Sequence, residues 1–233
     1  MSKNNIKNVL FTTATLAFCA TTGAGFAQSA SDVEKMSFFI TSTPGPDGAN
    51  FGGLVGADAH CATLAQAAGS SKDWAAYLSA SMIIDRSSGK AVVTDGIDAR
   101  SRIGNGPWYN AKGVLIAKDV EALHSADNNI SLVTALDESG NQINGRGSKP
   151  NEHDILTGSD SAGNFSTAGG DTTCSNWTSG GEGSAIVGHH DRAGLSSGRN
   201  MVSWNSAHGS AGCSANDLPK TGGAGLLYCF ATN

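Results

Sequence analysis

The amino-acid sequence predicts a loop-rich α+β domain in which short antiparallel strands and one or two helices are held by disulfide bonds. The 233 residues include 31 glycines and only 15% charged residues. This composition disfavours long helices, because a glycine costs about 1 kcal/mol in a helix interior. Apolar and aromatic residues nevertheless recur along the chain, which argues against disorder. Four cysteines follow the first thirty residues, and an even number favours two disulfides.

Residues 1–27 have the pattern of a secretory signal. Two lysines precede an uncharged, mostly apolar stretch at 9–20, and residues 25–27 offer small side chains to a signal peptidase. The stretch is shorter than the roughly 20 residues that cross a membrane. We therefore expect a secreted or periplasmic protein without a transmembrane segment. A surface lipoprotein is not expected, because the bulky Phe18 precedes Cys19.

Without the signal the chain has 13 basic and 20 acidic residues. A net negative chain with no basic stripe excludes nucleic acid as a partner. Oxidation is possible outside the cytoplasm, so the four remaining cysteines are expected in disulfides, for which spacing allows three pairings. A zinc site is the competing interpretation, but no CxxC pair is present. The four are Cys61, Cys174, Cys213 and Cys229.

The first elements are predicted from residue spacing. Residues 36–42 form an aromatic and β-branched run, which predicts a strand that ends in a Pro/Gly turn. A helix is predicted from a cap at Asp58 to a stop at Gly69, because apolar residues between them follow helical spacing. Residues 74–82 and 90–94 are predicted as strands.

The second half of the chain is expected to be dominated by turns. Residues 103–117 contain an apolar run, and residues 118–124 are expected to form one short helix. From 137 to 171 turn-forming residues predominate, a loop length that favours a functional role. An apolar run at 225–231, which carries Cys229, predicts a core strand. No repeat or linker interrupts the chain, so one domain is expected at 36–233 after a short lead at 28–35.

Ordered blocks of residues resemble the C-type lectin-like superfamily, and within it the endostatin-like branch. They are Gly56-Ala57-Asp58 before Cys61, residues 74–79, residues 158–160 with Gly163, Cys174 with Trp177, Cys213, and residues 227–230. Segments similar to 52–61, 98–111, 153–160, 174–179 and 227–230 also recur in a bacterial family of secreted lectin-like domains. The resemblance spans residues 36–231. It implies nested disulfides, Cys61 with Cys229 and Cys174 with Cys213.

The resemblance suggests one set of ligand-binding residues. Sugar-binding members hold calcium through a Glu-Pro-Asn or Gln-Pro-Asp tripeptide and a later Trp-Asn-Asp, because calcium takes oxygen ligands. Residues 149–152 and 204–206 stand in the matching order, with a lysine and a serine replacing two of the expected ligands. The candidate residues are Asn151, Glu152, Trp204 and Asn205, and a turn with a core tryptophan is the alternative.

A second candidate binding surface comprises Arg100, Arg102, Trp108 and Tyr109. Arginine beside exposed aromatic residues is a recurrent interface composition. In the alternative interpretation Trp108 is buried and both arginines pair with acids.

Oxygen ligands for calcium are also available in the 137–164 loops. Asp137 and Glu138 form one candidate metal site and Asp160 belongs to another, with turn capping by the same side chains as the alternative. No other cofactor is expected.

Histidines raise the question of zinc. Endostatin binds zinc through histidines near its N-terminus, but the comparable stretch here has none, so that site is not carried over. His189 and His190 should point to opposite faces of a strand and cannot share one ion. The resemblance favours a structural turn at His153-Asp154.

No catalytic motif of a known class is present, so we expect a non-enzymatic protein. The favoured function is a secreted recognition module that binds a glycan, a matrix component or an extracellular protein, with the oligomeric state open. A calcium-dependent binding protein that uses the 137–164 loops is one alternative. A hydrolase with an unrecognised site is the other.

Overall fold

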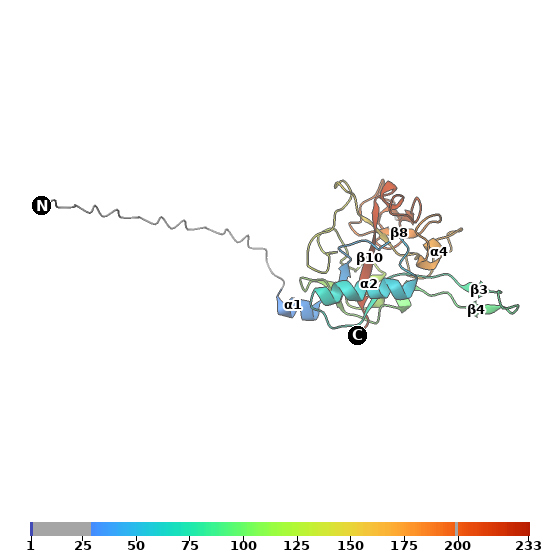
Figure 1. Cartoon of the computed structure of the whole chain (residues 1–233), viewed down its shortest axis with the longest axis horizontal. Coiled ribbons are helices and arrows are strands. Elements are labelled where there is room, and N and C mark those ends of the chain that lie inside the picture. Colours follow the sequence, from blue (N-terminus) through green and yellow to red (C-terminus); the bar gives the residue numbers. More distant parts are fainter. Residues whose placement is uncertain (2–28, 199) are drawn as a thin grey trace.

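The computed structural model describes residue 1, residues 29–198 and residues 200–233. Residues 2–27 of the expected signal, with Cys19, lie outside the described residues. The described chain forms an α+β body with few helices and short strands (Figure 1). Within these residues, no helix combines the length and hydropathy that a membrane crossing requires.

The main sheet is built on the C-terminal strand β10 (Gly223–Ala231). The other strands of this sheet are β1 (Phe38–Ile40), β2 (Trp74–Ala76), β7 (Asp154–Leu156), β8 (Ile186–His189) and β9 (His208–Gly209). β10 pairs with β1 and β2 in antiparallel fashion, and β8 joins β7 to β9 in the same way. The pairing of β10 with β7 is parallel, which departs from the expected antiparallel arrangement.

Both faces of β10 are buried, because its alternate side chains enter two hydrophobic clusters. Tyr228 and Phe230 belong to the cluster that contains Trp108 and Trp204. On the other face, the cluster includes Leu227 and Cys229 of β10, and Ala57, Cys61 and Ala65 of helix α2. The predicted strand at 225–231 is therefore confirmed as a core element.

Helix α2 (Leu54–Ala67) confirms the predicted helix but begins earlier than expected. Gly53, with φ 88°, stands at the cap position, and Gly69, with φ 91°, lies two residues beyond the last helical residue as predicted. Asp58, the expected cap, lies inside the helix. Its carboxylate accepts a hydrogen bond from the Ala76 backbone N–H at 2.8 Å, so it ties α2 to β2.

Three short α-helices accompany α2 in the described residues. α1 (Ala30–Lys35) occupies the expected lead, and the Ser29 hydroxyl caps it. α3 (Val120–Leu123) lies within the predicted helix at 118–124, with Asp119 accepting a hydrogen bond from the Ala122 N–H. α4 (Cys174–Trp177) is one irregular turn that carries a cysteine.

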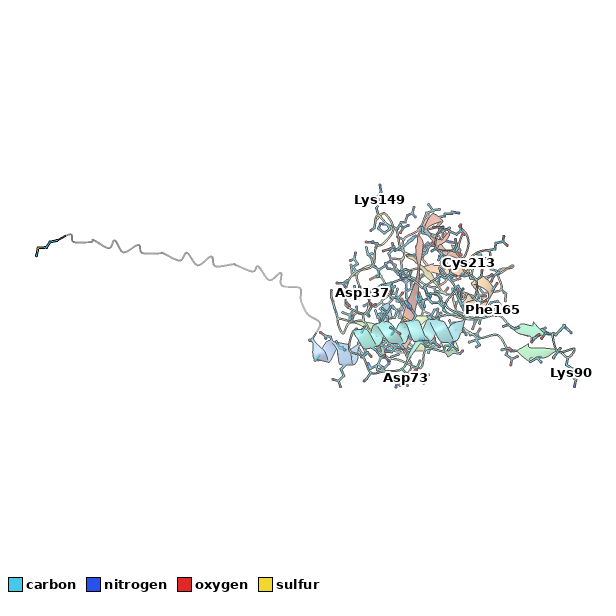
Figure 2. The ribbon with its side chains drawn as sticks, viewed as in Figure 1. Asp73, Lys90, Asp137, Lys149, Phe165 and Cys213 are labelled. Atoms are coloured by element: carbon cyan, nitrogen blue, oxygen red, sulfur yellow. A yellow bond between two sulfur atoms is a disulfide. The ribbon has the colours of Figure 1, made fainter. Side chains whose placement is uncertain are left out.

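Two small hairpins flank the body. β5 (Trp108–Tyr109) pairs with β6 (Leu115–Ala117) and is packed into the core. β3 (Ile83–Asp85) pairs with β4 (Val92–Thr94) in an arm that projects away from the body (Figure 1). Figure 2 places Lys90 at its far end. The arm exposes several large apolar side chains, namely Met82, Ile83, Ile84, Val92 and Val93.

The disulfides are the two that the resemblance implies. Cys61 joins Cys229 across a sequence separation of 168, and Cys174 joins Cys213 across 39. All four cysteines are buried. The outer bridge fixes α2 to β10, and the inner one fixes α4 to the segment before β10.

The outer disulfide should contribute more to stability than the inner one. Chain-entropy arguments give about 5 kcal/mol for Cys61–Cys229 and about 4 kcal/mol for Cys174–Cys213, because the first closes the longer loop. Urea unfolding of the Cys61→Ala/Cys229→Ala and Cys174→Ala/Cys213→Ala proteins measures both losses. A larger loss for the inner pair would contradict this ranking.

The projecting arm should be dispensable for folding, because none of its side chains belongs to either hydrophobic cluster. Replacing residues 83–94 with two glycines is expected to change the free energy of unfolding by no more than about 1 kcal/mol. Urea unfolding measures the change. A substantially larger loss would show that the arm supports the body.

Candidate functional site

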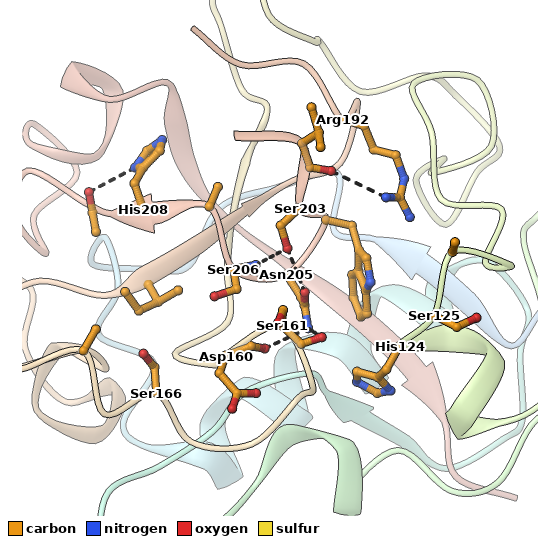
Figure 3. A pocket seen from close by; sticks show the side chains of 17 residues that line it. His124, Ser125, Asp160, Ser161, Ser166, Arg192, Ser203, Asn205, Ser206 and His208 are labelled. Atoms are coloured by element: carbon orange, nitrogen blue, oxygen red, sulfur yellow. Dashed lines mark hydrogen bonds between the residues drawn. The ribbon is translucent and has the colours of Figure 1, made fainter. Parts of the chain in front are cut away.

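A polar pocket of about 770 Å³ opens beside β8 and β9 (Figure 3). This volume is in the range that holds small ligands. Ten of its 17 lining residues are polar, and they come from segments far apart in the sequence. We name it the serine-rich pocket for the five serines among these ten: His124, Ser125, Asp160, Ser161, Ser166, Arg192, Ser203, Asn205, Ser206 and His208.

A hydrogen-bonded chain fixes one wall of this pocket. The Asn205 side-chain amide donates to the Tyr77 hydroxyl at 3.0 Å and to the Asp160 carbonyl at 3.0 Å. The Tyr77 Oη lies 2.7 Å from His124 Nε2. Because His124 Nδ1 lies 2.8 Å from the Val120 carbonyl, which can only accept, Nδ1 carries the proton and Nε2 accepts from Tyr77.

Burial keeps the Tyr77 and His124 side chains of this hydrogen-bonded network uncharged. Desolvation raises the pKa of the buried Tyr77 phenol above its ordinary value, although the Asn205 hydrogen bond opposes the shift. Desolvation likewise lowers the pKa of His124 below 6.5, against the opposing effect of its bond to Val120. Both side chains are therefore uncharged near pH 7.

Two glycines are required for this arrangement. A Cβ on Gly163 would lie 2.3 Å from His124 Nε2 and 2.7 Å from the Tyr77 hydroxyl. A Cβ on Gly188 in β8 would lie 1.8 Å from the Trp204 carbonyl oxygen. Glycine thus allows the loop after β7 and the segment before β9 to close around the pocket wall.

Trp204 also lines the pocket, although it is only 3% exposed. Its ring packs against Tyr77 and Tyr228, with centroid distances of 4.8 and 5.3 Å. Among the described residues, none accepts a hydrogen bond from the Trp204 indole N–H. Of the residues suggested by the lectin resemblance, Trp204 and Asn205 therefore do reach one pocket.

Asn151 and Glu152 do not line the serine-rich pocket with Trp204 and Asn205. Asn151 lines a different hollow, and Glu152 accepts a hydrogen bond from the Asn144 side chain at 2.9 Å. The four candidate ligands of a lectin-type calcium site are therefore divided between two places.

The acids expected to bind calcium serve as turn caps. Asp137 Oδ1 accepts the backbone N–H groups of Ser139 and Asn141, and Asp160 Oδ1 accepts those of Ala162 and Asn164. Each pattern is an Asx turn. Glu138 accepts from Ser42 instead. None of the three belongs to the one group of three potential metal ligands found among the described residues, so we do not propose calcium at Asp137, Glu138 or Asp160.

The binding surface predicted around Trp108 assumes that this side chain is exposed, and that assumption is wrong. Trp108 is 1% exposed, and its indole N–H donates to the Ala231 carbonyl at 3.2 Å. Arg102 pairs with both Asp58 oxygens at 2.8 and 2.7 Å. Trp108 packs against Phe230 of β10 and Arg102 pairs with Asp58, so both are engaged within the fold.

The remaining members of that set are also engaged in the fold. Arg100 pairs with Glu121 at 2.6 Å. Half-buried Tyr109 lies under the Lys35 ammonium, 4.9 Å from the ring centroid. Arg100 and Tyr109 remain partly exposed, whereas Trp108 is buried in the core.

The potential metal ligands lie beside a second hollow of about 560 Å³, which we name the histidine pocket. Ligand atoms of His153, Asp154 and His189 lie within 4.8 Å of one another. His208 also lines this pocket. The expected structural turn at His153-Asp154 is wrong, because Asp154 begins β7 and both side chains are buried. Sequence spacing gave no signal for this cluster, since His189 stands 36 positions after His153.

No protein-family model matches the chain, and no curated protein matches it. The two pockets are therefore interpreted from their own geometry and chemistry.

The His124 imidazole should titrate below pH 6.5, because burial disfavours its charged form. Its contribution to stability is then fully present above about pH 6.5 and is lost as the pH falls towards its folded pKa. A histidine NMR titration of the folded protein measures the midpoint, with the urea-unfolded protein as control. A folded midpoint at or above the unfolded one would contradict the assignment.

Proposed function

We propose that the protein is an exported, non-enzymatic recognition module with a C-type lectin-like fold, which binds a glycan in the serine-rich pocket. The glycan belongs to a matrix component or to an extracellular protein partner. The observation that carries this proposal is the lining of a 770 Å³ hollow by hydroxyl, amide and imidazole groups. Such groups match the alternating donors and acceptors of a sugar.

The charges of the lining favour a neutral ligand. Asp160 and Arg192 are the charged lining residues apart from histidines. The Asp160 carboxylate is occupied by backbone N–H groups of its own loop. The Arg192 guanidinium donates to the Ile130 carbonyl and to the Asn128 side chain. Neither charge is free to select an ion, whereas the hydroxyl of the exposed Ser161 can rotate to suit a ligand.

The pocket wall is rigid before a ligand arrives. Asn205 is held at both ends of its side chain, since Oδ1 accepts from Ser203 at 3.1 Å and Nδ2 donates to Tyr77 and Asp160. The Trp204 indole N–H adds a free donor. A preorganised set of this kind lowers the ordering cost of binding.

Hydrolysis of a glycan is not favoured by this geometry. Among the described lining residues, Asp160 is the single carboxylate, whereas most glycoside hydrolases use two. The hydrolase alternative therefore has no second carboxylate here to act with Asp160.

The fold supports the lectin-like assignment in two respects. β1 near the start of the domain pairs with β10 at its end. The Cys174–Cys213 disulfide is nested within the Cys61–Cys229 disulfide. Export is supported by the expected signal and by the presence of these disulfides.

Filling the serine-rich pocket should abolish binding. Ser161 is exposed at the rim, so Ser161→Trp is expected to fold normally and to weaken binding of any array-positive glycan by at least about tenfold. Ser88→Trp on the projecting arm is the matched control and should bind like the wild type.

A broad glycan array, probed with and without calcium, supplies the ligand for this comparison. Binding that needs no calcium and is lost in Ser161→Trp supports the proposal. An array without any positive glycan would overturn it, as would equal losses in both variants. Binding only with calcium would favour the calcium-dependent alternative.

A further inference from the structure

Asp154 is an ionisable side chain buried without ordinary partners. It is 1% exposed, and neither carboxylate oxygen accepts a hydrogen bond from any residue within the described ranges. A bare buried carboxylate is costly, so native proteins pair such groups or use them to bind metals. Its nearest polar neighbours are imidazole nitrogens: Nε2 of His153 and Nε2 of His189 each lie 3.2 Å from Oδ1.

The strand register gathers these side chains on one face of the sheet. Asp154 stands opposite His189 in the antiparallel pair of β7 and β8. His208 stands opposite Val187, two residues from His189 and therefore on the same face. His208 Nε2 lies 3.0 Å from His189 Nε2 and 3.6 Å from Asp154 Oδ1.

The hydrogen bond that Nδ1 of each ring makes determines whether Nε2 carries a proton or a lone pair. His189 Nδ1 lies 2.8 Å from the Met201 carbonyl, and His208 Nδ1 lies 3.1 Å from the Gly209 carbonyl. Carbonyl oxygens only accept, so both Nδ1 atoms donate and both Nε2 atoms of the neutral rings present lone pairs.

His153 is held in the same way. Its Nδ1 lies 3.2 Å from Asp191 Oδ1, an oxygen that also accepts the Ala193 N–H at 3.0 Å. A carboxylate oxygen that accepts from the backbone favours a donating Nδ1. His153 Nε2 then presents a lone pair towards Asp154.

Three imidazole lone pairs and one carboxylate therefore face one another, and a cation between them removes their repulsion. We propose that His153, Asp154 and His189 bind a Zn²⁺ ion, with His208 as the fourth ligand at the rim of the histidine pocket. This proposal does not rest on glycan binding, although His208 lines both pockets.

The distances suit zinc. Tetrahedral ligands at Zn–N and Zn–O bonds of roughly 2.0 to 2.2 Å stand about 3.4 Å apart. The four measured separations that involve Asp154 Oδ1 or His189 Nε2 are 3.2, 3.2, 3.6 and 3.0 Å. His208 is not among the three residues whose ligand atoms all lie within 4.8 Å of one another, so its side chain, which is 27% exposed, has to turn towards the other three to complete the site.

The type of ligand atom, nitrogen or oxygen, determines which cation the site prefers. Calcium and magnesium take oxygen ligands, whereas imidazole nitrogen suits zinc and its first-row neighbours. The hydrogen bonds to Nδ1 are the outer contacts that orient metal-binding histidines. The histidine pocket, lined by three of these rings, gives an ion a path from solvent. His190 is excluded, because it faces away and lies 3.3 Å from the Asn144 carbonyl.

Titration of the oxidised, chelator-treated protein with Zn²⁺ tests the proposal. The expected results are one zinc per chain by elemental analysis, a higher Tm with zinc, and the visible spectrum of tetrahedral Co²⁺ when cobalt replaces zinc. Calcium at the same concentration should leave the Tm unchanged. Because all four cysteines of the described domain are in disulfides, they do not compete for the metal.

Three variants locate the site. His208→Gln, at the exposed rim, should fold and weaken zinc binding by at least about tenfold. His189→Gln should weaken it further, and His60→Gln, on helix α2, is the matched control and should bind zinc like the wild type. Circular dichroism and urea unfolding verify that each variant is folded.

Two results would overturn the proposal. One is the absence of a stoichiometric zinc in the wild-type protein, in which case protons alone neutralise the cluster. The other is equal zinc affinity in the wild type and the folded His208→Gln and His189→Gln proteins. Glycan binding measured on the His189→Gln protein separates this site from the serine-rich pocket, because His189 lines only the histidine pocket whereas His208 lines both.

Discussion

The Cys61–Cys229 disulfide joins the longest described helix to the strand on which the main sheet is built. Cys229 lies where β10 pairs with β1 on one edge and β2 on the other. Both faces of β10 are covered, so the bridge, the sheet and the two hydrophobic clusters meet in one strand. A chain with 31 glycines and few charges gains from such a constraint, because a cross-link removes entropy from the unfolded state.

The loops depend on this scaffold and carry the proposed functions. The serine-rich pocket takes its lining from the end of α3, the loop after β7, the turn after β8 and the segment before β9. Gly188 lets the Trp204 backbone approach β8, and Gly163 lets the loop after β7 cover His124. Both contacts require a residue without a Cβ.

The two pockets are neighbours that share His208 and Gly209 of β9. The glycan proposal uses rotatable hydroxyls and a neutral, fixed amide. The zinc proposal uses imidazole and carboxylate groups in a buried cluster. A metal that holds His208 would also fix the edge strand that bounds the serine-rich pocket, which places a structural zinc next to a binding surface.

Much of the fold was predictable because it rests on local patterns. The glycine and charge content predicted a loop-rich α+β chain, helical spacing from Cys61 to Ala68 predicted most of α2, and the apolar run at 225–231 predicted β10. The cysteine count predicted two disulfides, and only the resemblance supplied their pairing. The exposure of Trp108, Arg100 and Arg102 could not be predicted from the sequence, since exposure depends on which distant segments cover a side chain.

The tertiary structure alone decided the sites. Asp154, His189 and His208 are distant in sequence, and the register of β7, β8 and β9 brings them together, with His153 directly before β7. A shift of that register by one residue would send His189 to the opposite face, where His190 now lies. The sequence thus determined which elements form and how many bridges hold them. Long-range strand pairing, which no local pattern encodes, determined which polar side chains face one another.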